Sequence, residues 1–109
     1  MVTRLKGKMV LLLAVAQKIY PQVPMMLYNC ANDIVEMYKA KVTEDQGERF
    51  GFSTEMYGLR TGYLFRIEKQ PSGCLLTIET EGDGEDAARR VSLMFAVVDN
   101  MLPPYNEGK

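Results

Sequence analysis

The sequence predicts an α+β fold in two layers, with helices packed on one face of an antiparallel sheet. Three observations predict it: apolar residues recur at helical spacing in the first 42 residues, alternating segments and tight turns follow, and an amphipathic segment closes the chain. The expected order is helix, helix, strand, strand, strand, helix (α-α-β-β-β-α), with a three-stranded antiparallel sheet. We expect one domain over residues 1–109.

A helical hairpin is expected over about residues 3–42. Proline disfavours helical backbone in the residue before it, so Tyr20–Pro24 is expected to be the bend between two helices, the second beginning at about Pro24 and ending at about Val42. The apolar stripe of the first helix consists of Leu5, Met9, Leu12, Leu13, Ala16, Ile19 and Tyr20. The stripe of the second consists of Leu27, Cys30, Ala31, Ile34, Val35, Tyr38 and Val42.

The first segment also fits a secretion signal. Arg4, Lys6 and Lys8 precede the apolar run Met9–Ala16, and Ala14-Val15-Ala16 has the small-x-small form of a cleavage site. The sustained three- and four-residue spacing favours a structural helix, and both interpretations of residues 1–16 stay open.

The sheet is expected over about residues 48–81. Residues 43–48 are polar and lose the helical period, so they are expected to form a loop. Phe50, Phe52, Thr54 and Met56 then alternate with polar or small residues, which is typical of a half-buried strand. Gly58–Gly62 is expected to be the next turn.

The following hairpin is predicted down to its register. Gln70-Pro71-Ser72-Gly73 places proline and glycine at the second and fourth positions of a type I turn. Counting outward places Ile67 opposite Leu76 and Phe65 opposite Ile78 on one apolar face. A slip by one residue would mix threonine and glutamate into that face, so the pattern selects this register.

The last helix is expected over about residues 84–102, covering the sheet. Asp83 is placed to cap it, Glu85 and Asp86 suit the positive end of its dipole, and Pro103-Pro104 ends it. Residues 103–109 are expected to be a loose tail. The expected apolar face consists of Ala88, Val91, Phe95, Val98 and Leu102, with Ala87, Met94 and Met101 beside it, and Arg89 and Arg90 are expected on the solvated face.

Composition argues against several kinds of partner. Thirteen basic and 14 acidic residues give a net charge of −1, so no nucleic-acid partner is expected. The longest apolar run, Met9–Ala16, is too short to span a membrane, so no membrane partner is expected either. Cys30 and Cys74 are expected to be buried free thiols rather than a disulfide, which favours a cytoplasmic location.

The sequence contains few of the residue types and motifs that enzymes use for catalysis. Histidine is absent, which removes imidazole-activated nucleophiles, and we expect no catalytic residue, no metal and no cofactor. The acidic segment Glu79–Asp86 could suit calcium, but capping of the last helix is the favoured explanation. Tyr57, Arg60, Thr61 and Tyr63 could form a recognition surface, although their residue types are equally typical of strand ends.

The predicted order of strands and helix resembles that of a known family. Over Phe50–Leu102, two strands, a tight turn and a long closing helix resemble the C-terminal half of the helix-grip ligand-binding domains of the START-like superfamily, so a truncated helix-grip fold is the alternative architecture. That family has a curved sheet and a ligand cavity, for which the three strands expected here are too few. The resemblance rests on element order alone, so no functional residue is carried over.

The function expected from these observations is non-enzymatic. Val10, Leu11 and Val15 extend the apolar surface of the first helix beyond its main stripe, which favours self-association, most simply a homodimer, or another protein–protein interaction. The alternative is a carrier or sensor of a small apolar ligand held between the sheet and the last helix by Phe52, Phe65, Ile67, Ile78 and Phe95. An enzyme using carboxylate or lysine chemistry is a third hypothesis.

Overall fold

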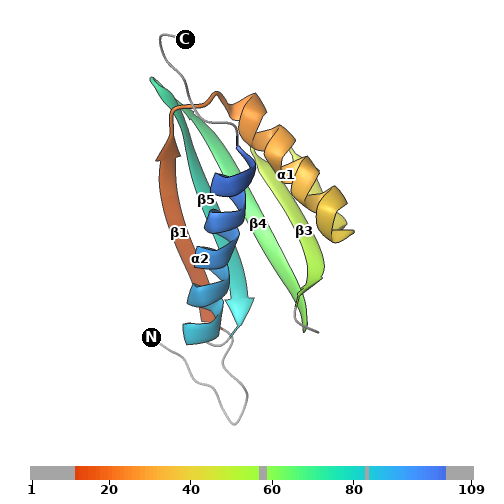
Figure 1. Cartoon of the computed structure of the whole chain (residues 1–109). Coiled ribbons are helices and arrows are strands. Elements are labelled where there is room, and N and C mark those ends of the chain that lie inside the picture. Colours follow the sequence, from red (N-terminus) through yellow and green to blue (C-terminus); the bar gives the residue numbers. More distant parts are fainter. Residues whose placement is uncertain (1–11, 57–58, 83, 103–109) are drawn as a thin grey trace.

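The structure is a computed structural model that describes residues 12–56, 59–82 and 84–102. It has an α+β fold with two helices and a five-stranded antiparallel sheet (Figure 1). In chain order the elements are β1 (Leu12–Tyr20), α1 (Pro24–Tyr38), β2 (Lys41–Gln46), β3 (Arg49–Met56), β4 (Leu59–Gln70), β5 (Gly73–Gly82) and α2 (Gly84–Met101).

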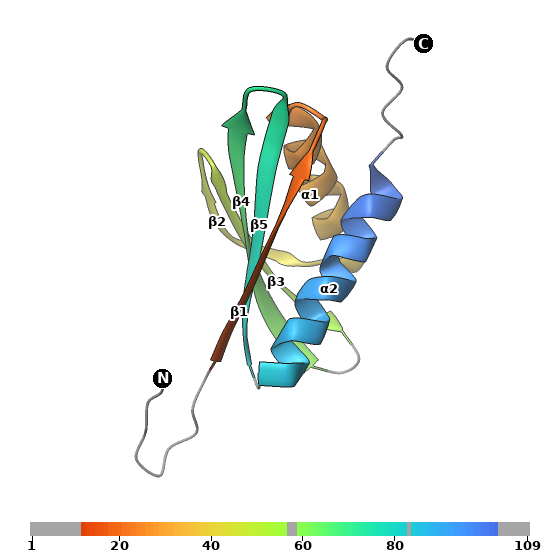
Figure 2. The same cartoon turned by 90° about the vertical axis from the view of Figure 1, so that its left-hand side faces the viewer.

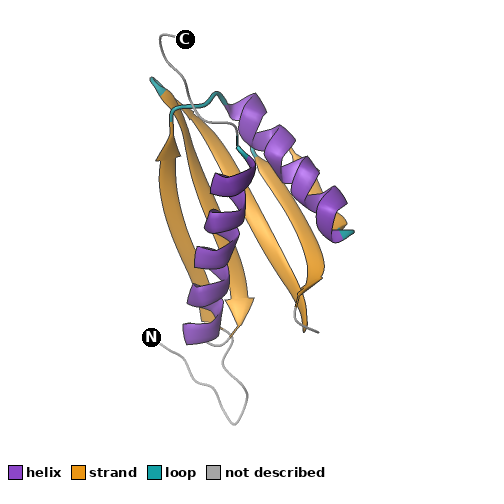
Figure 3. Ribbon diagram, in the orientation of Figure 1, coloured by secondary structure: helices purple, strands orange, loops and turns teal. Residues whose placement is uncertain are grey.

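The helices form one layer and the sheet forms the other. The strand order is β1-β5-β4-β3-β2, so β1 and β2 are the two edges. Both helices lie on the same face: α2 crosses β1 and β5, and α1 crosses β3 and β4 (Figure 3). Within the described ranges, no helix covers the opposite face, which we call the open face.

The segment predicted to be the first helix is a strand over its described part. Leu12–Tyr20 pairs along its whole length with β5, from Leu12 opposite Gly82 to Tyr20 opposite Cys74. Because the run from Leu12 to Ala16 is apolar at every position, its pattern fits a buried helix as well as a strand. The prediction of a helical hairpin is therefore wrong. Residues 1–11, with the rest of the expected stripe, lie outside the described residues.

The second predicted helix is confirmed but ends four residues early. Proline begins α1 at its first position, and Lys39 ends it with a left-handed backbone (φ 54°). The amide of Ala40 then donates to the carbonyl of Val35, which closes the helix end. The chain turns directly into β2, so the segment predicted to be a polar loop is mostly an edge strand, paired with β3.

The β4–β5 hairpin has the predicted register. Gln70 lies opposite Gly73, Ile67 opposite Leu76 and Phe65 opposite Ile78. Phe65, Ile67, Leu76 and Ile78 are all buried beneath the helices. The alternation and the turn are both local signals, and here they agree with the tertiary structure.

The last helix is confirmed, but its buried face is rotated from the predicted one. The buried residues of α2 are Ala87, Val91, Met94 and Val98. Phe95 is only half-buried, and Ala88 is exposed. The proposed cap, Asp83, and the expected tail, residues 103–109, lie outside the described residues.

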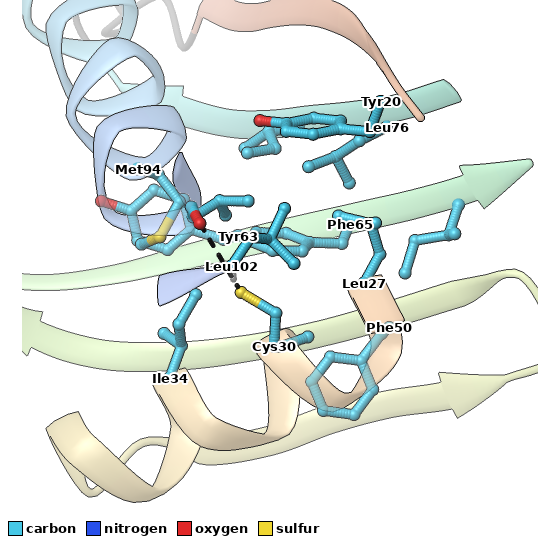
Figure 4. Packing of buried hydrophobic residues seen from close by; sticks show 14 of the residues in the cluster. Tyr20, Leu27, Cys30, Ile34, Phe50, Tyr63, Phe65, Leu76, Met94 and Leu102 are labelled. Atoms are coloured by element: carbon cyan, nitrogen blue, oxygen red, sulfur yellow. Dashed lines mark hydrogen bonds between the residues drawn. The ribbon is translucent and has the colours of Figure 1, made fainter. Parts of the chain in front are cut away.

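The core lies between the sheet and both helices (Figure 4). Phe52 is fully buried, and its ring lies 5.4 to 6.1 Å, centroid to centroid, from those of Phe50, Tyr63 and Phe65. Leu27, Cys30 and Ile34 of α1 pack on this layer beside Val91, Met94 and Val98 of α2. The predicted shared layer is confirmed for the sheet residues and for Val91 and Val98, whereas Phe95 is only half-buried.

No helix in the described part of the chain is both long and apolar enough to cross a membrane. The cytoplasmic location expected from the cysteines stays a prediction.

Candidate functional site

A small crevice separates α2 from the C-terminal end of α1, above β4. Its volume is about 160 Å³. It lies on the helical side of the sheet, in the layer where the sequence placed a ligand. Its lining residues are Tyr38 of α1, Tyr63 of β4, and Arg90, Leu93, Ala96, Val97 and Asn100 of α2.

The lining is mostly apolar and comes from rigid elements. Tyr63 is buried, whereas Leu93 is 43% exposed at the mouth of the crevice. Leu93 and Val97 are one helical turn apart, so they lie on the flank of α2 that faces α1. Hydrophobic side chains with a few polar groups are the usual lining of a small-molecule site.

Arg90 contributes the cationic group of the crevice, and its side chain, 19% exposed, lies only partly on the solvated face where it was expected. Its Nη2 donates to the carbonyl of Glu81 at 3.1 Å, and its Nη1 lies 3.5 Å from a carboxylate oxygen of Asp86. Its Nε is buried and has no hydrogen-bond partner among the described residues. An unsatisfied buried donor costs about 1–3 kcal/mol, so an acceptor that reaches this Nε after a small movement of the Arg90 side chain would relieve a defect.

The predicted ligand residues lie beside the crevice rather than around it. Phe52, Phe65, Ile67 and Ile78 are at most 2% exposed and belong to the packed core. Phe95 lies on the opposite flank of α2 from Leu93. The crevice is lined by other side chains, and a ligand role for these five residues stays a prediction. No sequence signal singled out Tyr38 or Leu93 as site residues.

A second hollow lies on the open face, around Gly62. It is a groove of about 480 Å³ whose lining includes Ser53, Arg60, Leu64, Glu79 and Glu81. The space above Gly62 is empty, since a Cβ added there would have no atom within 4 Å. Charged and polar side chains border the groove, and no helix of the described residues covers it.

The suggested recognition surface around Arg60 is divided by the sheet. Thr61 and Tyr63 are buried on the helical side. Arg60 borders the groove on the open face, where its Nη1 donates to Ser53 Oγ at 3.3 Å. Tyr57 lies outside the described residues. Alternation along β4 therefore separates residues that are neighbours in sequence.

The acidic segment shows ion pairing. Glu79 pairs with Arg66, and Asp86 pairs with Arg89 at 3.2 Å. Among the described residues, no group of three or more cysteine, aspartate or glutamate side chains is arranged to hold a metal ion.

Asp99 of α2 connects the helix to β1. It accepts a hydrogen bond from the Tyr20 hydroxyl at 2.7 Å and forms an ion pair with Lys18 at 2.7 Å. Burial of the Tyr20 ring, together with the hydrogen bond to Asp99, raises the pKa of the Tyr20 hydroxyl well above its usual value. The neutral phenol is thus the form that this contact stabilises.

Both thiols are free and buried. Burial raises the pKa of Cys30 to about 11, with smaller contributions from Asp33 and Asp99, and burial also raises the pKa of Cys74. The Cys30 thiol lies 4.0 Å from the carbonyl oxygen of Val98, as the dashed line in Figure 4 marks. Neither sulfur has the low pKa of a reactive nucleophile.

These raised pKa values predict alkaline sensitivity. Unfolded thiols lose their protons near pH 8.5, whereas the folded Cys30 holds its proton to about pH 11. The free energy of unfolding should therefore fall as pH rises through this interval, by at most about 1.4 kcal/mol per pH unit for each thiol. Urea denaturation at pH 8 and pH 10 measures the fall, which should be smaller in Cys30→Ala. An equal fall in both chains would contradict the assignment.

The comparisons with known proteins add little to this geometry. No protein-family model matches the chain, and no curated protein matches it. Among solved structures, the crystal structure of Ara h 8.0201 is similar to 85% of this chain and 98% of its own chain, with 10% sequence identity and a TM-score of 0.49. A similarity of this size carries no argument about the function.

Proposed function

We propose that this protein binds a small molecule, with an apolar body and one hydrogen-bond acceptor, in the crevice between α1, α2 and β4. The observation that carries the proposal is an apolar hollow bordered by a buried donor, the Nε of Arg90, that lacks a partner among the described residues. The crevice is a different site from the one that the sequence suggested at Phe52, Phe65, Ile67, Ile78 and Phe95.

The volume sets the size of the ligand. An apolar cavity of about 150 Å³ can hold benzene, so the crevice suits a body of that size. Drug-sized ligands occupy about 300–1,000 Å³ and would project past Leu93 into solvent. Arg90 favours an anionic or carbonyl acceptor, because hydrogen bonds from a charged donor are the stronger ones. An ammonium group is disfavoured, because it has no acceptor and carries the same charge as the guanidinium.

The role is proposed to be that of a carrier or sensor rather than an enzyme. The residues that line the crevice include no carboxylate, thiol or lysine. Among the lining residues, only Tyr38 and Tyr63 belong to types that act in general acid–base or nucleophilic catalysis, so the lining favours binding over catalysis.

Titration with benzoate, followed by ¹H–¹⁵N correlation NMR, tests the proposal. The amides of Tyr63, Leu93, Val97 and Asn100 should shift together along one saturable curve. Benzyl alcohol should bind more weakly, and benzylammonium should bind most weakly, because it presents no acceptor and is repelled by Arg90. Saturable shifts confined to other residues would refute the proposal, as would equal binding of the three probes.

Two matched variants of α2 sharpen the test. Ala96→Phe places a ring in the crevice and should weaken benzoate binding at least tenfold. Ala88→Phe makes the same change at an exposed position on the other flank of the helix and should leave binding unchanged. Equal affinity in both variants would place benzoate elsewhere.

A further inference from the structure

The two edges of the sheet differ in the features that keep strands from pairing with other chains. The β2 edge is six residues long, carries Lys41, Glu44 and Asp45, and has an irregular register between Val42 and Glu44. Short length, charge and a bulge all discourage the addition of a further strand. This edge is protected.

The β1 edge has few of these protections. It is nine residues long and pairs with β5 without a register shift. Its one charged residue, Lys18, is paired with Asp99 of α2. Val15 and Ile19 are 47% and 66% exposed on the open face. Figure 2 looks onto this edge, and in the described part of the chain no element lies beyond it.

We propose that β1 pairs in antiparallel fashion with β1 of a second copy of this chain, across a two-fold axis at Ala16. The two sheets then join into one sheet of ten strands. A two-fold contact is isologous, so an antiparallel strand that is free along one side can serve as its own partner. This inference is independent of the ligand proposed above, which lies on the far flank of α2.

Charge and length select this register. With Ala16 opposite itself, all nine residues of β1 pair, and Lys18 lies opposite Ala14. A two-fold axis at Lys18 would instead oppose two ammonium groups directly, which is destabilising. Small side chains at Ala14 and Ala16 also leave space on the helical side of the joined strands.

The area is sufficient for a stable dimer. A nine-residue strand is about 30 Å long. The 18-residue helix α2 above it is about 27 Å long. The side of the molecule formed by β1 and α2 is one sheet layer plus one helix layer high, about 20 Å. Its area is roughly 600 Å² per copy, or about 1,200 Å² in a dimer, above the ~1,000 Å² expected of a biological interface. On the flank of α2 above β1, the exposed Ala88 lies three turns before Asp99, so a second helix can approach there.

Cysteine scanning along β1 tests the register. Directly opposed residues have Cα atoms about 4.5–5.5 Å apart, within the disulfide range of about 4.4–6.8 Å. Ala16→Cys should therefore give a disulfide-linked dimer under mild oxidation. Val15→Cys and Gln17→Cys, two matched controls, would lie about 8 Å from their own copies and should not cross-link. The native thiols are buried and free. Cross-linking that is equal at all three positions would overturn the register.

Sedimentation velocity from about 10 to 500 μM tests the association itself. The unchanged chain should shift from monomer to dimer across this range. Ala16→Glu opposes two carboxylates at the axis and should raise the dimer dissociation constant at least tenfold, with an unchanged circular dichroism spectrum. Ala88→Phe should also weaken the dimer, whereas Ala96→Phe should not. A monomer at every concentration would overturn the proposal, as would an Ala16→Glu variant that still dimerises normally.

Discussion

Replacing Phe52 with alanine should lower the free energy of unfolding by about 3–5 kcal/mol. The Phe52 side chain is fully buried and contacts three other aromatic rings, so its removal loses burial and leaves a cavity that rigid neighbouring strands cannot close. Domains of this size are typically stable by only about 5–15 kcal/mol. Urea denaturation monitored by far-ultraviolet circular dichroism measures the loss.

Phe95 provides the matched control for Phe52. It is the same residue type but only half-buried on α2. Phe95→Ala should therefore cost less than half as much as Phe52→Ala. A larger loss at Phe95 would mean that the buried face of α2 is the one predicted from the sequence rather than the one in the structure.

Replacing Gly73 with alanine should lower the free energy of unfolding by about 2–6 kcal/mol. Gly73 has a φ of 142°, which side chains rarely adopt, and a Cβ there would lie 1.9 Å from the carbonyl oxygen of Tyr20. Backbone strain and overpacking each cost about 1–3 kcal/mol. The change would push the end of β1 away from β5, and chemical denaturation measures the loss.

Gly62→Ala is the control for this substitution. Gly62 is also a strand glycine, but it has no positive φ, and a Cβ would meet no atom within 4 Å. Alanine at Gly62 should be neutral or should stabilise the protein by up to about 1 kcal/mol. Equal losses at the two positions would show that the close approach of Gly73 to Tyr20 does not exist in solution.

Local signals explain what the sequence predicted correctly. The β4–β5 register followed from one turn, Pro71-Ser72, and from alternation that places Phe65 and Ile67 on the same face. The beginning of α1 followed from Pro24 at its first position. In these segments the nearest neighbours in the chain decide the conformation.

The errors arise where distant pairing decides the conformation. Leu12–Tyr20 is a strand because β5, some sixty residues later, pairs with it, and its apolar run has no period that excludes a helix. Most of β2 is exposed, so its side chains carry no alternation, and backbone pairing with β3 holds it. The sequence predicted that helices cover one face of the sheet. It could not predict the crevice, because that depends on the spacing between α1 and α2.

A crystal structure of the protein with 4-bromobenzoate tests the central claim most directly, since anomalous scattering locates the bromine without bias from the surrounding model. The account predicts one bromine peak between Tyr38, Tyr63 and Val97, with the carboxylate on Arg90. Bromine found only in the open-face groove beside Arg60, or no bromine peak at saturating ligand, would contradict it.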